Sequence, residues 1–314
     1  MILTLLPNPS LDKTVVIPGF ALGAIHRTGE APVLAGGKGF NFARALRALG
    51  ETTLVVTPLA GYEGRRLKAL AEQEGFAVEG VTVSGELRNC LSVIDPARGN
   101  LLTEIYENRA PLQAGEWERL VARAATHFAE ARFLAVCGSF PPGMPDYGLR
   151  DVLELAGARG LPVLLDTAGP QTLDALPLGP ALLKINSLEA SALLDQTIVS
   201  AGEAVWAAKA LQQRGAQAVI ITLGRDGAVG VTAEGKSFGW AAPPVVALSP
   251  VGSGDSAFAG IVAGLTRGQS LQEATRLGMA AGAANTQQLG AGKFHLDQVE
   301  RLLPLVEPLT DLDV

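Results

Sequence analysis

The stretch SPVGSGDSAFAGIVAGL, residues 249–265, places one ionisable residue, Asp255, between a glycine loop and an apolar run. Residues 256–266 carry no charge, which predicts a buried helix, and Pro250 with the two glycines marks the loop that enters it. The Asp has two interpretations. It is an N-cap that accepts hydrogen bonds from first-turn amides, or it is a carboxylate held beside free amides that bind an anion. These residues alone favour the cap.

A second glycine cluster lies in APVLAGGKGFNFARALRALG, residues 31–50, before an apolar helix expected to run to about Leu49. The spacing is not that of a P-loop. No acidic residue follows about 20 residues later, as a dinucleotide-binding fingerprint requires. A tight turn with close helix packing is the plainest interpretation. However, Lys38 beside free amides would suit a phosphate, and Asn41 is polar in an otherwise apolar helix.

The rest of the chain alternates short apolar runs with longer helical patterns. The apolar runs are mostly continuous and end in Gly, Pro, Asn or Asp, which is typical of strands in a parallel sheet covered on both faces. These predicted strands lie at 2–6, 53–61, 133–140, 162–166, 181–186 and 218–224. Amphipathic helical patterns lie between them, at 63–74, 146–159, 187–194 and 203–214.

This alternation predicts an α/β fold, a doubly wound and mostly parallel sheet with helices on both faces. We expect residues 1–314 to form one such domain. In doubly wound sheets the ligand lies outside the carboxyl ends of the strands. The candidate site residues therefore follow the predicted strands, at 8–12, 138–139, 166, 184–189 and 222–224.

Two stretches interrupt the alternation. Residues 13–27 contain strand-like pieces and no helical pattern, and residues 88–109 predict a hairpin that turns at 95–100. We expect insertions at about 12–27 and 87–109 to form a small β-sheet lid. Such a sheet would have one apolar face to cover, against a ligand or another subunit.

The composition excludes several classes of protein. With 48% hydrophobic and 18% charged residues, the chain is not extensively disordered. A net charge of −6 and scattered basic residues argue against a nucleic-acid or membrane partner. The two cysteines and three histidines lack the spacing of a zinc site or a Ser-His-Asp triad. The start lacks the basic region of a signal peptide and no apolar run could span a bilayer, so we expect a cytoplasmic protein.

The two glycine clusters together resemble the paired signatures of the ribokinase-like carbohydrate kinases, in the phosphofructokinase B branch. The resemblance covers nearly the whole chain, because six further segments follow in the order expected of that branch. These segments are PNPSLDKT (7–14), ELRNCLSV (86–93), CGSFPPGMP (137–145), LLDTAGP (164–170), KINSLEA (184–190) and TLGRDGA (222–228). On that evidence the interpretation of Asp255 changes from a cap to a catalytic residue.

The resemblance implies that Asp255 is the general base, which takes the proton of the acceptor hydroxyl while ATP delivers its γ-phosphoryl group. Phosphoryl transfer depends mainly on positioning and on stabilising charge. The amides of residues 251–254, which include Gly252, Ser253 and Gly254, would then face the transferring oxygens.

On the nucleotide side, KINSLEA resembles the family's Asn-x-x-Glu element. It implies that Glu189 holds Mg²⁺ through water and that Asn186 orders that shell. Capping of a surface helix by Asn186, with Glu189 in its first turn, is an alternative that the same geometry allows. The resemblance also implies contacts to ATP, by Lys184, Thr222 and Gly224 at the phosphates and by Asn285 at the adenine.

The acceptor side is implied by residues nearer the N-terminus. Asp12 would bind sugar hydroxyls, and Gly37 and Asn41 would contact the sugar body. The candidates for a phosphate already on the sugar are Lys38, Arg88 and Ser139, where an arginine suits bidentate contacts. Arg27 is a further basic candidate, which could act across a dimer interface.

Lys38 in GGKG, together with RNC and TEI, most resembles the 1-phosphofructokinase and tagatose-6-phosphate kinase subgroup. This implies conversion of fructose 1-phosphate and ATP to fructose 1,6-bisphosphate and ADP, with tagatose 6-phosphate as the alternative acceptor. The chain departs from the subgroup in the predicted lid. Asn108 and Arg109 stand where Pro-Gly is usual, and His26 stands where Asn is usual.

Two other classes of function are weighed against a kinase. One is a catalytically silent sensor of sugar phosphates on the same fold, against which the intact Asp255 and Asn186-x-x-Glu189 count. The other is a nicotinamide-dependent oxidoreductase, against which the glycine spacing counts. We expect a small-molecule sugar-phosphate substrate and a homodimer formed through the lid sheets.

Overall fold

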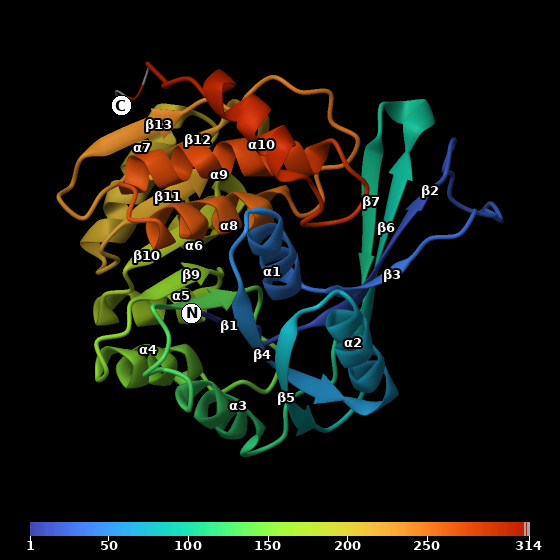
Figure 1. The fold of residues 1–314 in the computed structure, drawn as a ribbon, viewed down its shortest axis with the longest axis horizontal. Helices are drawn as coiled ribbons and strands as arrows, with labels where there is room; N and C mark the ends of the chain where they lie inside the picture. Colours follow the sequence, from blue (N-terminus) through green and yellow to red (C-terminus); the bar gives the residue numbers. More distant parts are fainter. Residues whose placement is uncertain (311, 313–314) are drawn as a thin grey trace.

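The computed structural model describes residues 1–310 and 312, in which a large sheet lies between helices and a smaller sheet stands at its side (Figure 1). Within these residues the large sheet has nine strands, in the order β13-β12-β11-β10-β9-β8-β1-β4-β5. All of its pairs are parallel except β11–β12 and β12–β13 at one edge. The strands are β1 (Ile2–Leu5), β4 (Thr53–Ala60), β5 (Ala77–Val83), β8 (Phe133–Cys137), β9 (Val163–Asp166), β10 (Leu182–Asn186), β11 (Val219–Thr222), β12 (Ala228–Val231) and β13 (Ser237–Trp240).

Helices cover both faces of this sheet, because the buried apolar residues form two separate cores. One core includes α2 (Gly61–Gln73), α3 (Glu116–Ala125), α4 (Gly148–Gly157), α5 (Pro170–Ala175), α6 (Ser187–Leu194) and α7 (Ala201–Gln213). The other includes α8 (Ser253–Thr266), α9 (Leu271–Thr286) and α10 (Leu296–Leu302), while α1 (Lys38–Ala48) contributes to both. The predicted doubly wound α/β fold is confirmed.

The two cores explain why the central strands are mostly apolar. In β1, Leu3 and Leu5 point into one core and Ile2 points into the other, and all three are at most 2% exposed. Successive side chains of a strand point to opposite faces, so a strand buried on both faces is almost entirely apolar. The one polar side chain of β1, Thr4, is also buried and shares a hydrogen bond of 2.8 Å with Thr53 Oγ1. The six strands predicted from apolar runs are all present.

The smaller sheet has the order β3-β2-β6-β7, with β2 parallel to β6 and the other pairs antiparallel. Its strands are β2 (Ser10–Val16), β3 (Val33–Gly36), β6 (Arg88–Asp95) and β7 (Leu101–Tyr106). The predicted hairpin at 88–109 is confirmed. Of the strand-like pieces predicted in 13–27, only the first is a strand, because β2 ends at Val16, before Pro18 and two glycines with positive φ, Gly19 and Gly23. The strand that was not predicted is β3, which runs into the glycine cluster at 36–39.

The order of the strands identifies the edge where a ligand would bind. From β1 the chain moves to β4 and β5 on one side, and later to β8 on the other side, so the strand order reverses between β1 and β8. Ligands of open α/β sheets bind at such a reversal. Asn8 and Ser139 follow these two strands, and Asn8 Nδ2 donates a hydrogen bond of 3.0 Å to Ser139 Oγ. The smaller sheet, which we call the lid sheet, also begins here, at Ser10.

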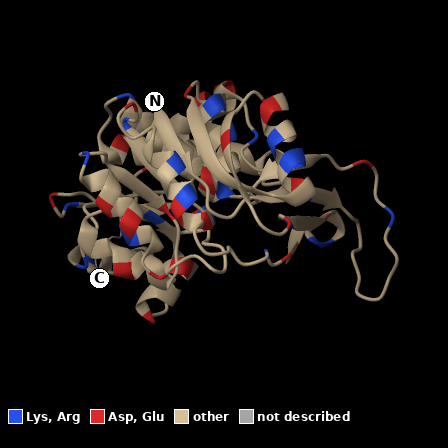
Figure 2. Cartoon of the chain, turned by 90° about the horizontal axis from the view of Figure 1, so that it is seen from below, with Lys and Arg blue, Asp and Glu red and all other residues tan. Residues whose placement is uncertain are grey.

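The surface agrees with the scattered charges of the sequence. Lys and Arg residues are interspersed with Asp and Glu residues along the helices and loops (Figure 2). In the described part of the chain, no helix combines the length and hydropathy needed to cross a membrane.

Candidate active site

The carboxyl ends of the strands and the lid sheet together line a cavity of about 820 Å³. Residues from both glycine clusters, several strand ends and the lid meet there, although they are distant in sequence. The predicted site residues that line it are Asp12, Gly37, Lys38, Asn41, Arg88, Ser139, Lys184, Asn186, Glu189, Thr222, Gly252, Gly254 and Asp255.

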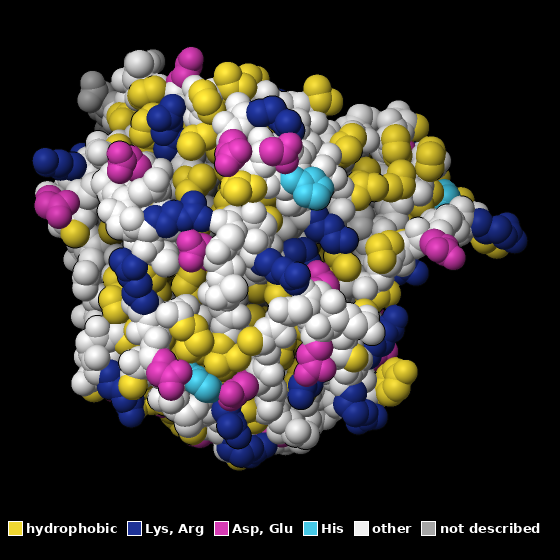
Figure 3. Space-filling view, in the orientation of Figure 1, with side chains coloured by type: hydrophobic (Ala, Val, Ile, Leu, Met, Phe, Trp, Pro, Cys, Tyr) yellow, Lys and Arg dark blue, Asp and Glu magenta, His cyan; other side chains and the backbone are white. Residues whose placement is uncertain are grey.

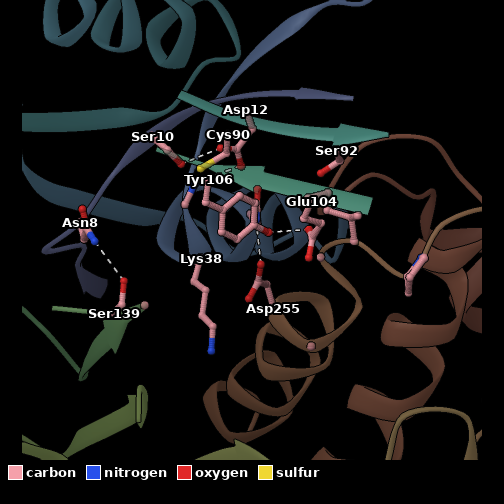
Figure 4. Close-up of a pocket in the computed structure, with 18 of the residues that line it drawn as sticks. Asn8, Ser10, Asp12, Lys38, Cys90, Ser92, Glu104, Tyr106, Ser139 and Asp255 are labelled. Carbon is pink, nitrogen blue, oxygen red and sulfur yellow. Dashed lines mark hydrogen bonds between the residues drawn. The ribbon is translucent and has the colours of Figure 1, made fainter. Parts of the chain in front are cut away.

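Asp255 is not the N-cap of its helix. Helix α8 begins at Ser253, and its N-cap is Gly252, whose φ of 79° lies in the left-handed region that favours glycine. Asp255 therefore lies in the first turn and is only 7% exposed. Its Oδ2 accepts a hydrogen bond of 2.8 Å from Asn41 Nδ2, so the carboxylate faces the other glycine cluster (Figure 4).

The amides before Asp255 are only partly free. Ser253 N–H donates to Pro250 O at 3.1 Å, and Val251 N–H donates to Ser249 Oγ at 3.3 Å. The expectation that residues 251–254 all offer amides is therefore wrong for these two, because the entering loop turns back on itself. Among the described residues, the amides of Gly252 and Gly254 have no hydrogen-bond acceptor.

A second charged group lies deeper in the cavity. Lys184 Nζ lies 3.3 Å from both oxygens of Asp166, and Lys38 Nζ lies 3.1 Å from Asp166 Oδ1 and 3.0 Å from Glu189 Oε1. Lys38, predicted to bind a sugar phosphate, thus reaches toward the carboxylates of the predicted nucleotide side. Burial would raise the pKa of Asp166, but the two lysines outweigh it and lower that pKa. Asp166 is therefore ionised.

The same charges act on Asp255. Burial, reinforced by the negative charge of Asp166, raises the pKa of Asp255 to about 6. The positive charges of Lys38 and Lys184, and the hydrogen bond from Asn41, oppose that rise. A carboxylate with this pKa is mostly ionised at neutral pH and still basic enough to accept a proton, which suits a general base.

The structure confirms the cap interpretation of KINSLEA, and the Mg²⁺ role of Asn186 and Glu189 stays a prediction. Asn186 caps α6, because its side-chain oxygen accepts from Glu189 N–H at 2.8 Å, and Glu189 Oε2 accepts from Asn186 N–H at 2.9 Å. Both residues also line the cavity. The cap holds the Glu189 carboxylate in place while its Oε1 faces Lys38.

The lid supplies a largely polar wall of the cavity, of which the sequence analysis predicted Asp12 and Arg88. Ser10 Oγ donates to Asp12 Oδ1 at 2.6 Å and Gly37 N–H donates to Oδ2 at 3.2 Å, which fixes the carboxylate. Alternate residues of three lid strands point the same way (Figure 4). Their spacing in the sequence could have predicted this, because every second residue of a strand lies on the same face. The cavity-facing residues are Ser10, Asp12 and Thr14 in β2, Arg88, Cys90 and Ser92 in β6, and Leu102, Glu104 and Tyr106 in β7.

Four predicted residues do not line the cavity. Asn285 is fully buried, where Nδ2 donates to Val251 O at 2.8 Å and Oδ1 accepts from Gly292 N–H at 2.6 Å. It ties two loops together and does not face an adenine in this cavity. Gly224 begins a short 3₁₀ turn beyond Thr222, and Ser253 uses its amide within the turn. Arg27, the further basic candidate, is exposed in the loop between β2 and β3.

Comparisons with known proteins found a matching family model and several similar proteins. A family model described as "pfkB family carbohydrate kinase" matches residues 16–298. Tagatose-6-phosphate kinase of Staphylococcus epidermidis is 28% identical over 311 residues, 98% of this chain and 99% of the relative. 1-Phosphofructokinase of Bacillus subtilis is 29% identical over 309 residues, with the same shares covered. The structure of phosphofructokinase-2 from Escherichia coli is 29% identical, with a TM-score of 0.87, over 96% of this chain and 98% of that chain.

Proposed function

Because the chain belongs to the pfkB family of carbohydrate kinases, and is therefore a phosphotransferase with a hydroxyl group as acceptor, we propose that its acceptor is a phosphorylated ketohexose and its donor is ATP. The substrate we propose is fructose 1-phosphate, which gives fructose 1,6-bisphosphate, and tagatose 6-phosphate is the alternative. The observation that carries the proposal is Asp255, a buried carboxylate with a pKa of about 6 in the first turn of α8.

Each group around Asp255 has a part in the proposed transfer. Asp255 accepts the proton of the acceptor hydroxyl as that oxygen attacks the γ-phosphorus. Asn41 holds Oδ2 of Asp255, so Oδ1 is the oxygen available to the hydroxyl. The amides of Gly252 and Gly254 stabilise the charge on the transferring oxygens. Lys184 adds a positive charge next to these amides. Its Nζ lies close to Gly254, because a Cβ added to that glycine would be 3.3 Å from it.

The residues at the other wall fit a magnesium ion that enters with ATP. Mg²⁺ commonly takes one or two carboxylates and completes its shell with phosphates and water. Glu189 has one oxygen fixed by the cap and the other facing the cavity, with Asp166 on the far side of Lys38. No group of three potential metal ligands occurs within residues 1–310 and 312, so phosphates and water would complete the shell. The bound ion would neutralise phosphate charge.

The acceptor would lie between the lid wall and the turn after β1. Asp12 and the polar lid residues suit sugar hydroxyls, because a carboxylate and several side-chain oxygens face one volume. Arg88 and Ser139 suit the phosphate that the sugar already carries, since an arginine offers several donors in one plane. Lys38 would join them only by leaving its present partners, Asp166 and Glu189.

The outer face of the lid supports the proposed homodimer. In β7, Leu101 and Ile105 alternate with the cavity-facing residues and are 53% and 54% exposed. Hydrophobic side chains gather on this part of the molecule in the space-filling view (Figure 3). An exposed apolar sheet face of this kind is typical of a protein interface. We therefore include pairing of two copies through their lids in the proposal.

The proposed function is tested by an assay of ADP release coupled to NADH oxidation. Fructose 1-phosphate, tagatose 6-phosphate, fructose 6-phosphate and ribose are compared at equal concentrations with MgATP. The proposal predicts the highest kcat/KM for fructose 1-phosphate. A higher value for tagatose 6-phosphate would select the alternative, and a higher value for ribose would refute a phosphorylated acceptor. No turnover, in protein that binds MgATP by calorimetry, would favour a sensor.

A further inference from the structure

Arg109, in the loop after β7, is a buried cation with unused hydrogen-bond donors. Its side chain is only 4% exposed, and Nη1 donates a long hydrogen bond of 3.4 Å to Pro7 O. The Nε and Nη2 atoms are buried, and neither has a partner among the described residues. The buried carboxylate of Glu116 attracts Arg109, but its oxygens accept hydrogen bonds from Ser84 and Gln113.

A guanidinium group in this position is costly to the fold. Buried donors without partners and a buried charge without an ion pair both disfavour the folded state. Burial lowers the pKa of Arg109 to about 10, and the positive charge of Arg88 adds to that effect against the attraction of Glu116. Arg109 is therefore charged at neutral pH and incompletely compensated. A cost of this kind in a folded protein calls for an explanation.

The explanation lies in the neighbouring arginine. Arg88, at the start of β6, lines the cavity, and its Nη2 donates to Asn8 O at 3.3 Å. Arg88 and Arg109 thus bind consecutive carbonyls, those of Asn8 and Pro7, in the turn that follows β1. Arg88 Nε and Asn8 Oδ1 are also buried without a partner among the described residues. Unsatisfied polar atoms of three side chains therefore gather around the turn after β1, where Arg88, Asn8 and Ser139 line the cavity and Arg109 lies outside its lining.

We propose that Arg109 determines specificity for an acceptor that already carries a phosphate, as a positioning residue that acts through Arg88. Arg109 does not line the cavity, so it does not touch the acceptor in this arrangement. Its positive charge repels that of the Arg88 guanidinium, which lines the cavity. A phosphate dianion there attracts both arginines and offsets their mutual repulsion, whereas a neutral sugar hydroxyl cannot. This inference rests on the proposed function, because it assigns the phosphate of that substrate.

The proposal is tested with Arg109→Met, which removes the charge and keeps most of the side-chain volume, and with Arg109→Lys, which keeps the charge. Arg119→Met is the matched control. Arg119 also lies near Glu116, at 3.8 Å, but it is more than half exposed and does not line the cavity. The kcat, the KM for the phosphoketose that the wild type uses, and the KM for MgATP are measured for each protein.

Arg109→Met should raise the KM for the phosphoketose about tenfold, while kcat and the KM for MgATP change less than about twofold. Arg109→Lys should restore most of the affinity, and Arg119→Met should match the wild type. An unchanged KM in Arg109→Met would overturn the proposal, as would a parallel rise in the KM for MgATP. If circular dichroism shows that Arg109→Met is unfolded, Arg109→Gln replaces it with the same expectations.

A binding measurement separates this proposal from the proposed function. Inorganic phosphate is titrated by calorimetry into the wild type and Arg109→Met, each saturated with MgADP. If the wild type turned over no phosphoketose, the proposed function would fail, yet phosphate binding about tenfold weaker in Arg109→Met would still support the role of Arg109. Equal binding by the two proteins, or binding by neither, would overturn that role.

Discussion

Replacing Asn41 by alanine removes the hydrogen bond that holds the proposed general base. Asn41 Nδ2 donates to Asp255 Oδ2 at 2.8 Å, and both side chains are buried. A hydrogen bond to a charged group contributes about 1.5–3 kcal/mol, and one pKa unit corresponds to about 1.4 kcal/mol. Because the bond favours the ionised form, its loss should raise the pKa of Asp255 from about 6 to about 7–8.

This shift predicts how much activity is lost at each pH. At pH 7 about nine tenths of Asp255 is ionised in the wild type, against about one tenth to one half in Asn41→Ala. The value of kcat/KM at pH 7 should therefore fall about two- to tenfold through ionisation alone. At pH 9 Asp255 is ionised in both proteins, so most of this loss should disappear.

The assay is ADP release between pH 5 and 9.5, with kcat/KM for the preferred phosphoketose plotted against pH. Asn89→Ala is the control, because Asn89 bonds Glu107 on the lid and does not line the cavity. Loss of a direct contact between Asn41 and the sugar would lower kcat/KM equally at every pH. An acidic limb with an unchanged midpoint would therefore refute the argument, even if activity were lower.

Three further predictions follow from the cavity and the lid. Burial raises the pKa of Asp255 from 3.8 to about 6, so the folded state loses stability as the pH rises through about 6. Asp255→Asn should be more stable than the wild type at pH 8, by up to about 3 kcal/mol, and not below pH 4. Equal calorimetric melting curves at pH 8 would contradict this. Glu189→Gln should raise the Mg²⁺ concentration for half-maximal activity about tenfold, and an unchanged Mg²⁺ titration would count against its role. Ile105→Lys should sediment as a monomer and the wild type as a dimer, whereas a monomeric wild type would exclude lid pairing.

The sequence allowed the centre of the large sheet to be predicted but not its edges. Central strands bury both faces and are therefore mostly apolar, as Ile2 and Leu3 show by entering different cores. Strand β5 contains exposed and half-buried residues, such as Thr82 and Val81, and Glu79 and Gly80 interrupt its apolar pattern. Strand β12 has only four residues, one of which is Gly230. Their strand structure depends on neighbours that are distant in the sequence.

Residues of the candidate site were predictable where the backbone determines the position of the side chain. The partners of long, flexible side chains were harder to predict. Asp255 and Asn186 follow glycine or strand-end patterns, and both line the cavity. The direction of Lys38 depends on Asp166 and Glu189, which lie more than 120 residues away in the sequence. The amide of Ser253 was predicted to be free, but it bonds Pro250 O, and this acceptor depends on how the loop before α8 turns. Hydrogen-bond partners of this kind depend on tertiary contacts, which leave no pattern in the local sequence.

The most direct test of the account is the effect of Asp255→Asn on chemistry and on binding, measured separately. The kcat is measured with the preferred phosphoketose, and the affinity for MgATP is measured by calorimetry. As the general base, Asp255 should contribute about 10²–10⁴-fold to kcat, while the affinity for MgATP stays within about threefold, since asparagine keeps the shape of the side chain. A kcat within tenfold of the wild type, in a variant that binds MgATP normally, would contradict the assignment of Asp255 as the base.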